Sequence, residues 1–234
     1  MRRVFGCFVV VLGLAAPALA QERAAADAPP TPSAPAEQPK NLRTFRSPFG
    51  FRGYLNFDEI WMSASRSFDA VLGTTSLTAG GVGADVLNLW RQAFVRVGVS
   101  RMGGLGGRAF VANGEVVPLG VPIRVRLRTV ELGAGWRFVH RRLPKYTFYG
   151  GAGVLRVRYA EESDFARDED VSEGFWGRAM FGGVEYPLRS WLVAGGEVQY
   201  RRVPGALGDG GVSAVFGETD LGGFAVRGLI AIKK

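Results

Sequence analysis

The chain has 234 residues, of which 29 are Lys or Arg and 21 are Asp or Glu, giving a formal charge of +8. The arginines are spread along the chain at strand spacing and form no basic run, so we expect no nucleic-acid partner. The single cysteine, Cys7, lies in a segment that we expect to be cleaved. Thiolate catalysis, disulfides and cysteine-ligated metals are therefore excluded from the mature chain.

The first twenty residues, MRRVFGCFVVVLGLAAPALA, have the pattern of an exported protein. A basic start is followed by an apolar run and by Ala18 and Ala20 in an A-x-A cleavage pattern, which predicts a signal peptide over 1–20. The run is shorter than the ~20 apolar residues that a membrane-spanning helix needs. Removal of Arg2 and Arg3 lowers the formal charge from +8 to +6.

Two further regions follow the signal peptide. Residues 21–46 are rich in alanine and proline, and they predict a disordered periplasmic linker. From 47 to 234 the composition changes to glycine, valine, phenylalanine and arginine. We expect this region to form one domain.

Period-two alternation of apolar and polar residues predicts eight strands in this domain. The predicted strands cover 51–62, 77–88, 93–101, 123–139, 146–159, 174–186, 191–202 and 221–233. Short connections, at 89–92, 140–145 and 187–190, alternate with long ones near 63–76, 102–122, 160–173 and 203–220. An antiparallel meander places all short connections at one end, so the predicted fold is an all-β, eight-stranded antiparallel up-and-down transmembrane β-barrel.

The connections also predict the orientation of the barrel. Short turns would lie in the periplasm with the chain ends, and long loops would lie outside the cell. Asn113-Gly114 between apolar residues predicts a hairpin turn that extends the third and fourth strands beyond the membrane. A soluble eight-stranded barrel with the alternation inverted is the alternative fold, but it would bury glutamate and several arginines without an obvious ligand.

The charged residues of the strands are predicted to face the interior, because the lipid-facing wall of a membrane barrel is apolar. Hairpin pairing places Asp85 opposite Arg96. The same arithmetic places Glu131 opposite Val154, and Arg178 opposite Gln199. The predicted lumen charge network comprises Asp85, Arg96, Glu131, Arg137, Arg156, Arg158, Arg178, Glu197, Arg201 and Arg227.

This network has two interpretations. It could form a charged constriction in a narrow pore, or a set of salt bridges that fills the interior and neutralises itself. The second is favoured because an unpaired charge in a confined lumen is costly and a barrel of eight strands leaves little room beyond its side chains.

Catalysis and metal binding have less support in the sequence than a structural or pore-forming barrel has. The only histidine, His140, lies in a short connection at the predicted periplasmic end, without an obvious serine partner, so we expect no enzyme and no cofactor. The acidic loop 160–174 carries oxygen ligands that suit calcium, but its spacing matches no calcium loop. We therefore expect no metal site.

Three segments carry a resemblance to a known family: YTFYGGAGVLRVRY (146–159), MFGGVEYPLRSWLVAGGEVQYRR (180–202) and GGFAVRGLIAIKK (222–234). With the signal peptide, they make 47–234 similar to the eight-stranded outer-membrane β-barrel superfamily that includes OmpA-like and opacity-like domains. The family usually ends in an aromatic residue, whereas here Ile230 and Ile232 keep the alternation and Lys234 follows.

The resemblance implies an outer-membrane protein that contacts outer-membrane lipid and uses the barrel-assembly machinery during biogenesis. The expected function is non-enzymatic: a structural barrel or a narrow passive pore with a salt-bridged lumen. The alternative is a binding protein that holds a lipid, another apolar ligand or a surface partner through its extracellular loops and upper lumen. The solute or surface ligand is not identified by the residues.

Overall fold

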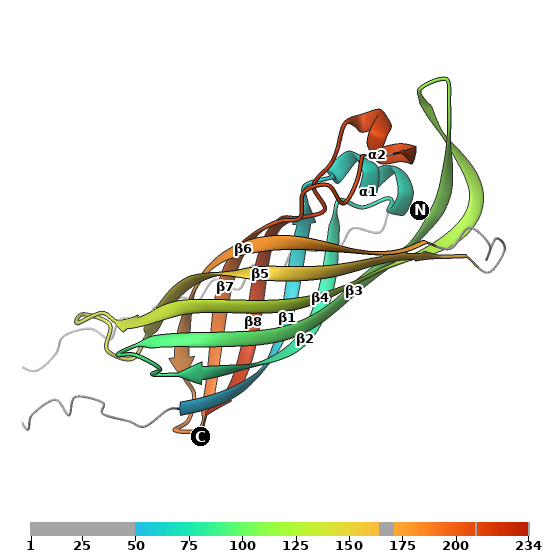
Figure 1. The fold of residues 1–234 in the computed structure, drawn as a ribbon. Coiled ribbons are helices and arrows are strands. Elements are labelled where there is room, and N and C mark those ends of the chain that lie inside the picture. Colours follow the sequence, from blue (N-terminus) through green and yellow to red (C-terminus); the bar gives the residue numbers. More distant parts are fainter. Residues whose placement is uncertain (1–49, 164–170, 209, 234) are drawn as a thin grey trace, which may run out of the picture. The chain divides into compact units, whose positions relative to one another are not determined.

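The computed structural model of the protein describes residues 50–163, 171–208 and 210–233 (Figure 1). The expected signal peptide (1–20) and linker (21–46) lie outside the described residues.

Eight antiparallel strands form a closed barrel in which each strand pairs with the next and β8 pairs with β1 (Figure 1). The predicted all-β barrel fold is confirmed. The strands are β1 (Gly50–Met62), β2 (Ser76–Leu87), β3 (Ala93–Ala112), β4 (Glu115–Val139), β5 (Thr147–Glu162), β6 (Val171–Pro187), β7 (Leu192–Arg202) and β8 (Gly223–Lys233). Two short helices, α1 (Ser65–Leu72) and α2 (Gly211–Phe216), lie in connections predicted as loops.

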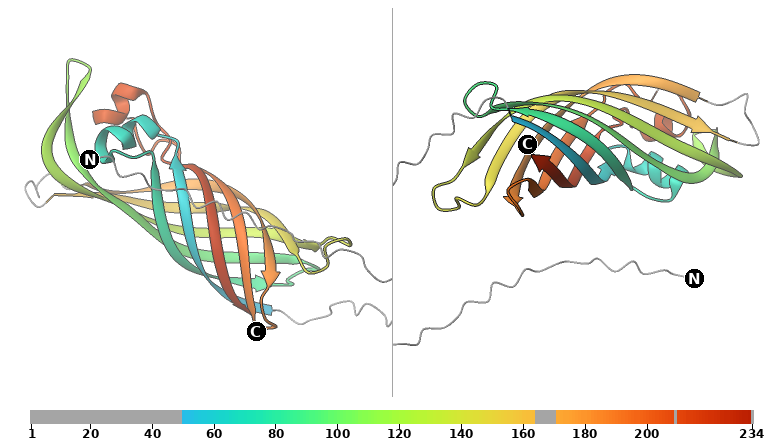
Figure 2. Two further views of the ribbon diagram at one scale, coloured as in Figure 1. Left: turned by 180° about the vertical axis from the view of Figure 1, so that it is seen from behind. Right: turned by 90° about the horizontal axis from the view of Figure 1, so that it is seen from below.

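The two ends of the barrel differ. The β2–β3, β4–β5 and β6–β7 connections are short and lie at one end, together with the start of β1 and the end of β8, where Arg52 and Lys233 are paired. We call this end the turn rim and the opposite end the loop rim. Figures 1 and 2 show α1 and α2 at the loop rim, beside the tall β3–β4 hairpin.

The β3–β4 hairpin rises beyond the other strands because β3 has 20 residues and β4 has 25, against 11 in β7 and in β8. Asn113 and Gly114 turn the chain with φ of 53° and 82°, and Ala112 pairs with Glu115. Positive φ at both central residues is the geometry that an Asn-Gly hairpin turn needs. The predicted turn is confirmed.

The wall alternates between an apolar outer face and a mixed inner face. On β8, Arg227 and Leu229 are buried inside, whereas Val226 and Ile230 are exposed outside. Exposed apolar side chains in this number suit a lipid solvent and not water. Within the described residues, no helix is long and apolar enough to cross a membrane.

Inward-facing glycines make room for large interior rings. A Cβ atom placed on Gly83 would lie 2.3 Å from the Tyr54 ring and 2.7 Å from the Val97 carbonyl oxygen. At Gly135 it would lie 2.4 Å from the Gly150 carbonyl oxygen. No side chain fits at either position, so these glycines allow the aromatic rings to fill a narrow barrel.

Two apolar clusters occupy the interior. The turn-side cluster comprises Tyr54, Leu87, Phe94, Tyr149, Phe181, Val193, Leu229 and Ala231. The loop-side cluster includes Ile60, Met62, Phe68, Leu77, Ala79, Met102, Ile123, Val125, Leu127, Leu155, Val157, Ala179, Val203, Leu221 and Ala225. The barrel interior is therefore packed with side chains toward both rims.

The two helices are joined by a cap that comes from a distant part of the sequence. Glu218, just after α2, accepts hydrogen bonds from the backbone N–H groups of Arg66 and Ser67, at 3.0 and 2.8 Å, and from the Ser67 hydroxyl at 2.6 Å. Partial burial opposes ionisation of Glu218, but these hydrogen bonds outweigh it and lower the pKa of the carboxyl. The first turn of α1 is thus capped by a residue of the β7–β8 connection.

Candidate functional site

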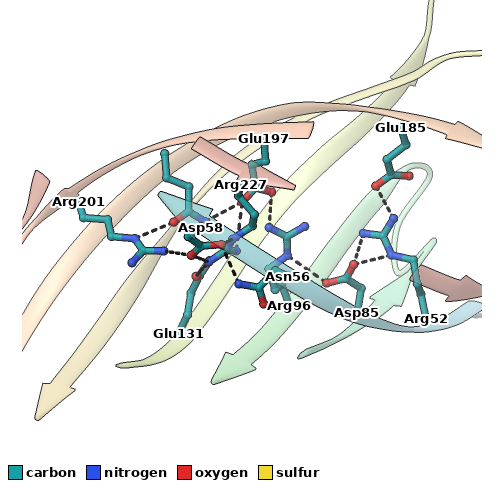
Figure 3. Close-up of polar contacts among 11 residues, drawn as sticks. Arg52, Asn56, Asp58, Asp85, Arg96, Glu131, Glu185, Glu197, Arg201 and Arg227 are labelled. Atoms are coloured by element: carbon teal, nitrogen blue, oxygen red, sulfur yellow. Dashed lines mark hydrogen bonds and ion pairs between the residues drawn. The ribbon is translucent and has the colours of Figure 1, made fainter. Parts of the chain in front are cut away.

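The barrel encloses an ion network of five arginines and five carboxylates, contributed by every strand except β5. Figure 3 labels its members other than Arg137. Arg137 has a side-chain exposure of 17%, and the other nine side chains are at most 5% exposed. The members of the ion network are Arg52, Asp58, Asp85, Arg96, Glu131, Arg137, Glu185, Glu197, Arg201 and Arg227.

One half of the ion network lies toward the turn rim. Arg52 donates to Asp85, through Nε at 2.7 Å, and also to Glu185. Arg137 Nη2 lies 2.7 Å from Glu185 Oε2. Arg96 Nε lies 3.1 Å from Asp85 Oδ1, and the two residues are direct cross-strand partners, as the hairpin arithmetic predicted. Each carboxylate here contacts two arginines.

The other half surrounds Arg227. Its guanidinium makes a two-pronged contact with Asp58, at 2.8 and 3.0 Å, and reaches Glu197 at 3.2 Å and Glu131 at 3.5 Å. Arg201 donates to Asp58 Oδ2 at 2.9 Å. Bidentate arginine–carboxylate geometry is the strongest form of such a pair. Amide side chains complete this half: Asn56 donates to Asp58, and Gln199 links Glu197 to Arg201.

Arg96 joins the two halves and is enclosed by aromatic rings. Its Nη1 lies 2.5 Å from Glu197 Oε2. Its guanidinium carbon lies 4.8–5.6 Å from the ring centroids of Phe181, Tyr54, Tyr149 and Phe94. Cation–π contacts of this kind stabilise a desolvated guanidinium. The ring cage and the carboxylates together hold Arg96 in one position.

The ion network is covered on its loop side by the loop-side cluster. Leu127, Leu155 and Ala225 from three strands are fully buried there, next along the barrel from the charged residues. Three buried atoms of the ion network, Arg96 Nη2, Arg137 Nε and Glu131 Oε1, have no hydrogen-bond partner among the described residues. Every charged group is nevertheless paired and covered by apolar side chains, which leaves it poorly available to a substrate or ion. Within the described residues, no group of His, Cys, Asp and Glu side chains is arranged to hold a metal ion.

Seven of the ten predicted network residues are inside, but the prediction for Arg156 and Arg158 was wrong. Both side chains are exposed on the outer wall. Glu131 pairs with Leu155 and not with Val154, so the β4–β5 register differs by one residue from the prediction. A slip of one residue moves every side chain of a strand to the other face.

Arg178 is also on the outer wall, contrary to prediction. It pairs with Arg202 instead of Gln199, a difference of three residues. The reason is the β6–β7 turn: Pro187 pairs with Val193, whereas a PLRS turn would pair Tyr186 with Trp191. The turn therefore lies further along the chain and has one more residue between its paired ends. An odd difference again inverts the strand.

Sequence reasoning missed three members of the ion network, Arg52, Asp58 and Glu185. Arg52 and Asp58 alternate with Tyr54 and Asn56 along one face of β1, and this period-two pattern was the available signal. Glu185 lies an odd number of residues from Arg178, so placing Arg178 inside left Glu185 out of the predicted network.

A separate cavity of about 690 Å³ lies at the loop rim. Its wall includes Phe68, Val71, Leu72, Ile123, Val125 and Phe175. Glu161 and Glu173 also line it, and Glu161 accepts a hydrogen bond from Tyr159. Arg108 lines it as well, so the cavity is an apolar chamber with a margin of mixed charge, under α1 and α2.

Two other expectations concern the connections. His140 is in the exposed β4–β5 turn at the turn rim, where its Nδ1 accepts a hydrogen bond from the Arg142 N–H at 3.3 Å. Most of the acidic loop, 164–170, lies outside the described residues, while the strands on both sides extend into the predicted loop as far as Glu162 and Val171.

Comparison with known proteins supports the fold. No family model and no curated protein matches the sequence. The crystal structure of a major outer membrane protein from Thermus thermophilus is similar over 79% of this chain and 99% of that chain, with 13% identity and a TM-score of 0.52. Neisserial surface protein A is similar over 80% of this chain and 97% of that chain, with 11% identity and a TM-score of 0.48. Its closed sheet and its likeness to the Thermus thermophilus protein show that the chain has the fold of the eight-stranded outer-membrane β-barrels.

Proposed function

We propose that this chain is a non-enzymatic outer-membrane barrel with a closed lumen, which serves as a membrane-embedded scaffold for the surface at its loop rim. The observation that carries the proposal is the filled interior. The ion network neutralises itself, and the loop-side cluster covers it. Of the two expected variants, a structural barrel and a narrow passive pore, this arrangement favours the first.

The closed lumen is tested by conductance. Purified protein inserted into a planar bilayer should give no unitary currents between neutral and mildly acidic pH. Insertion is verified in parallel vesicles by cleavage at an introduced protease site between Asn113 and Gly114, with the barrel strands protected. Steady, ion-selective currents from the inserted wild-type protein would contradict the closed lumen.

A second candidate function is supported by the loop-rim cavity. Its volume of about 690 Å³ and its apolar wall are within the range of ligand pockets, which run from roughly 300 to 1,000 Å³. This cavity fits the alternative expectation of a binding protein that holds an apolar ligand in its upper lumen. The ligand class is a lipid or another elongated apolar molecule.

The second candidate is tested by filling the cavity. Native mass spectrometry of detergent-purified protein should detect one apolar molecule per chain. The Ala206→Trp variant, which places an indole in the cavity wall, should lose it, whereas Val117→Trp on the exposed part of β4 should retain it. Equal retention by both variants would exclude the cavity as the binding site.

A further inference from the structure

Eight arginines project from the outer wall of the barrel near the loop rim, on five consecutive strands from β3 to β7. Seven are exposed and Arg126 is half-buried. We call this group the arginine belt. It comprises Arg101, Arg124, Arg126, Arg128, Arg156, Arg158, Arg178 and Arg202.

The strand register places members of the belt side by side. Arg101 pairs with Arg128, and Arg128 pairs with Arg158, so three guanidinium groups extend from one row across β3, β4 and β5. Arg178 and Arg202 form a second direct pair, across β6 and β7. Like charges directly opposite one another are destabilising unless a counter-charge lies between them. The belt therefore needs anions.

The protein supplies few of them. Arg126 pairs with Glu162 at 2.7 Å, and Arg202 pairs with Asp220 at 3.1 Å. Arg158 donates to the Ser172 hydroxyl at 3.0 Å, which adds no charge. In the part of the chain that the structure describes, the other members form no ion pair, and these are Arg101, Arg124, Arg128, Arg156 and Arg178.

The position of the belt on the wall matches a membrane surface. On β4, Trp136 near the turn rim and Arg128 are eight residues apart, with exposed Val130 and Leu132 between them. At a rise of ~3.4 Å per residue and a strand tilt of ~40°, this corresponds to roughly 20 Å along the barrel axis. The apolar band of an outer-membrane barrel is about 25 Å tall, so the belt lies where lipid headgroups begin.

The belt also lines two shallow depressions on the outer wall. One, of about 370 Å³, lies among Arg126, Arg128 and Arg158, and Glu161, Glu162 and Ser172 also line it. Glu162 neutralises Arg126 there. The other, of about 440 Å³, lies among Arg101, Arg124 and Arg126. The second depression is lined by three arginines and, among the described residues, by no carboxylate, so it suits a phosphate group. Guanidinium forks match the oxygen geometry of phosphate.

We propose that the arginine belt binds the phosphate groups of a phosphorylated glycolipid in the leaflet at the loop rim. The inference rests on the proposed outer-membrane location. A lipid fits better than a soluble anion because the guanidinium groups lie on the lipid-facing wall, directly above exposed apolar side chains that would contact acyl chains. Arg101 and Arg158 lie on the two sides of Arg128, each one strand spacing of about 5 Å away, so the row is about 10 Å long at the backbone. A headgroup with two phosphates spans this row better than one with a single phosphate.

The test uses the full mature chain in phosphatidylcholine vesicles that contain a small fraction of either bis-phosphorylated lipid A or its dephosphorylated form. Lipid that remains with the protein after detergent extraction is measured by native mass spectrometry. Wild-type protein should retain the phosphorylated lipid about tenfold or more over the dephosphorylated one, and increasing salt should weaken this preference. The triple variant Arg101→Gln, Arg128→Gln, Arg158→Gln should lose it.

The matched control removes the same charge at the other end of the barrel, through Arg141→Gln, Arg142→Gln and Lys145→Gln in the exposed β4–β5 turn. It should bind as the wild type does. If the glutamine variant of the belt does not fold, the corresponding Arg→Lys triple variant keeps the charge but loses the bidentate geometry, and it should show a several-fold smaller preference.

Equal retention of both lipids, or equal binding by the belt and control variants, would overturn the proposal. So would competition by inositol hexakisphosphate in detergent without any retained lipid, since the belt would then recognise a soluble polyanion. These outcomes are independent of conductance. A negative result in the lipid-binding test therefore does not affect the proposal of a closed lumen. Unitary currents in the conductance test would likewise not affect the proposal that the arginine belt binds lipid.

Discussion

Glu197 on β7 and Arg96 on β3 meet across the lumen, with 2.5 Å between Oε2 and Nη1. The two strands are not neighbours in the sheet, so this contact spans the barrel and not one hydrogen-bonded pair. Glu197 also lies opposite Arg227 on β8. One carboxylate therefore serves two arginines from different sides of the wall.

Replacement of Glu197 by alanine should strongly destabilise the barrel, because Arg96 and Arg227 lose the acid between them. Breaking a buried pair from one side costs about 3–5 kcal/mol. The free energy of unfolding is measured by urea titration of tryptophan fluorescence in detergent. The control is Glu59→Gln on the outer wall, where Glu59 contacts Thr78 at 3.1 Å, and it should change stability by less than ~0.5 kcal/mol. A small loss for Glu197→Ala would mean that water reaches the ion network.

Valine at Gly83 should prevent normal closure of the barrel. Its Cβ would overlap the Tyr54 ring and crowd the Val97 carbonyl oxygen, and backbone cannot retreat as a flexible side chain can. We expect little folded protein in a refolding assay with detergent micelles. The matched variant is Gly80→Val on the same strand, where a Cβ meets nothing within 4 Å, and it should refold normally. Similar yields for the two variants would show that the ring can move.

Loss of the Glu218 cap should loosen α1 in a pH-dependent way. The pKa of Glu218 is lowered from its ordinary value of 4.5, so its carboxylate stabilises the folded loop above that pH and the effect is lost as the pH falls through the lowered pKa. At pH 7 the Glu218→Gln variant should exchange the α1 amide hydrogens about two- to fivefold faster than wild type.

The same comparison at a pH below the lowered pKa of Glu218 provides the control, because the protonated glutamic acid and the glutamine are then nearly equivalent. The two proteins should exchange at similar rates there. A difference that stays constant across this range would assign the effect to the shape of the side chain and not to its charge.

An epitope inserted between Asn113 and Gly114 should be tolerated and should be accessible to antibody on intact cells. The insertion lies at the tip of the β3–β4 hairpin, beyond the other strands at the loop rim. An epitope inserted between Arg141 and Arg142, in the β4–β5 turn, should be accessible only after the outer membrane is permeabilised. The reverse pattern would invert the assigned orientation.

The positions of the strands could be predicted from the sequence because polar and apolar residues alternate most strictly where one face of a strand contacts lipid and the other faces the enclosed lumen. On β7 and β8, charged residues face an enclosed lumen and apolar ones face lipid, and the predicted faces match those observed for Glu197, Arg201 and Arg227. The rule that polar residues face inward holds only within the apolar band. On β5 the chain leaves this band after Val154, so Arg156 and Arg158 can face outward.

The parts that could not be predicted depend on contacts between distant segments. The position and length of the β6–β7 turn decide on which face Arg178 lies. On β6 polar and apolar residues do not alternate strictly, so the sequence does not reveal a register that is wrong by an odd number of residues. The helix α1 receives its cap from Glu218, more than 140 residues later, so its local sequence carries no capping signal.

The pairing of β1 with β8 gives the ion network a second consequence, which concerns assembly. Asp58 and Arg227 are direct partners across this seam, where the first and last strands of the sheet meet. Before β1 pairs with β8, water can hydrate both charged groups. Pairing of the two strands buries Asp58 and Arg227 together, so each neutralises the other. A seam displaced by one residue would turn Arg227 toward lipid, at a cost of about 2–4 kcal/mol near the bilayer midplane. The buried charges thus make closure of the barrel in the wrong register less favourable than closure in the native one.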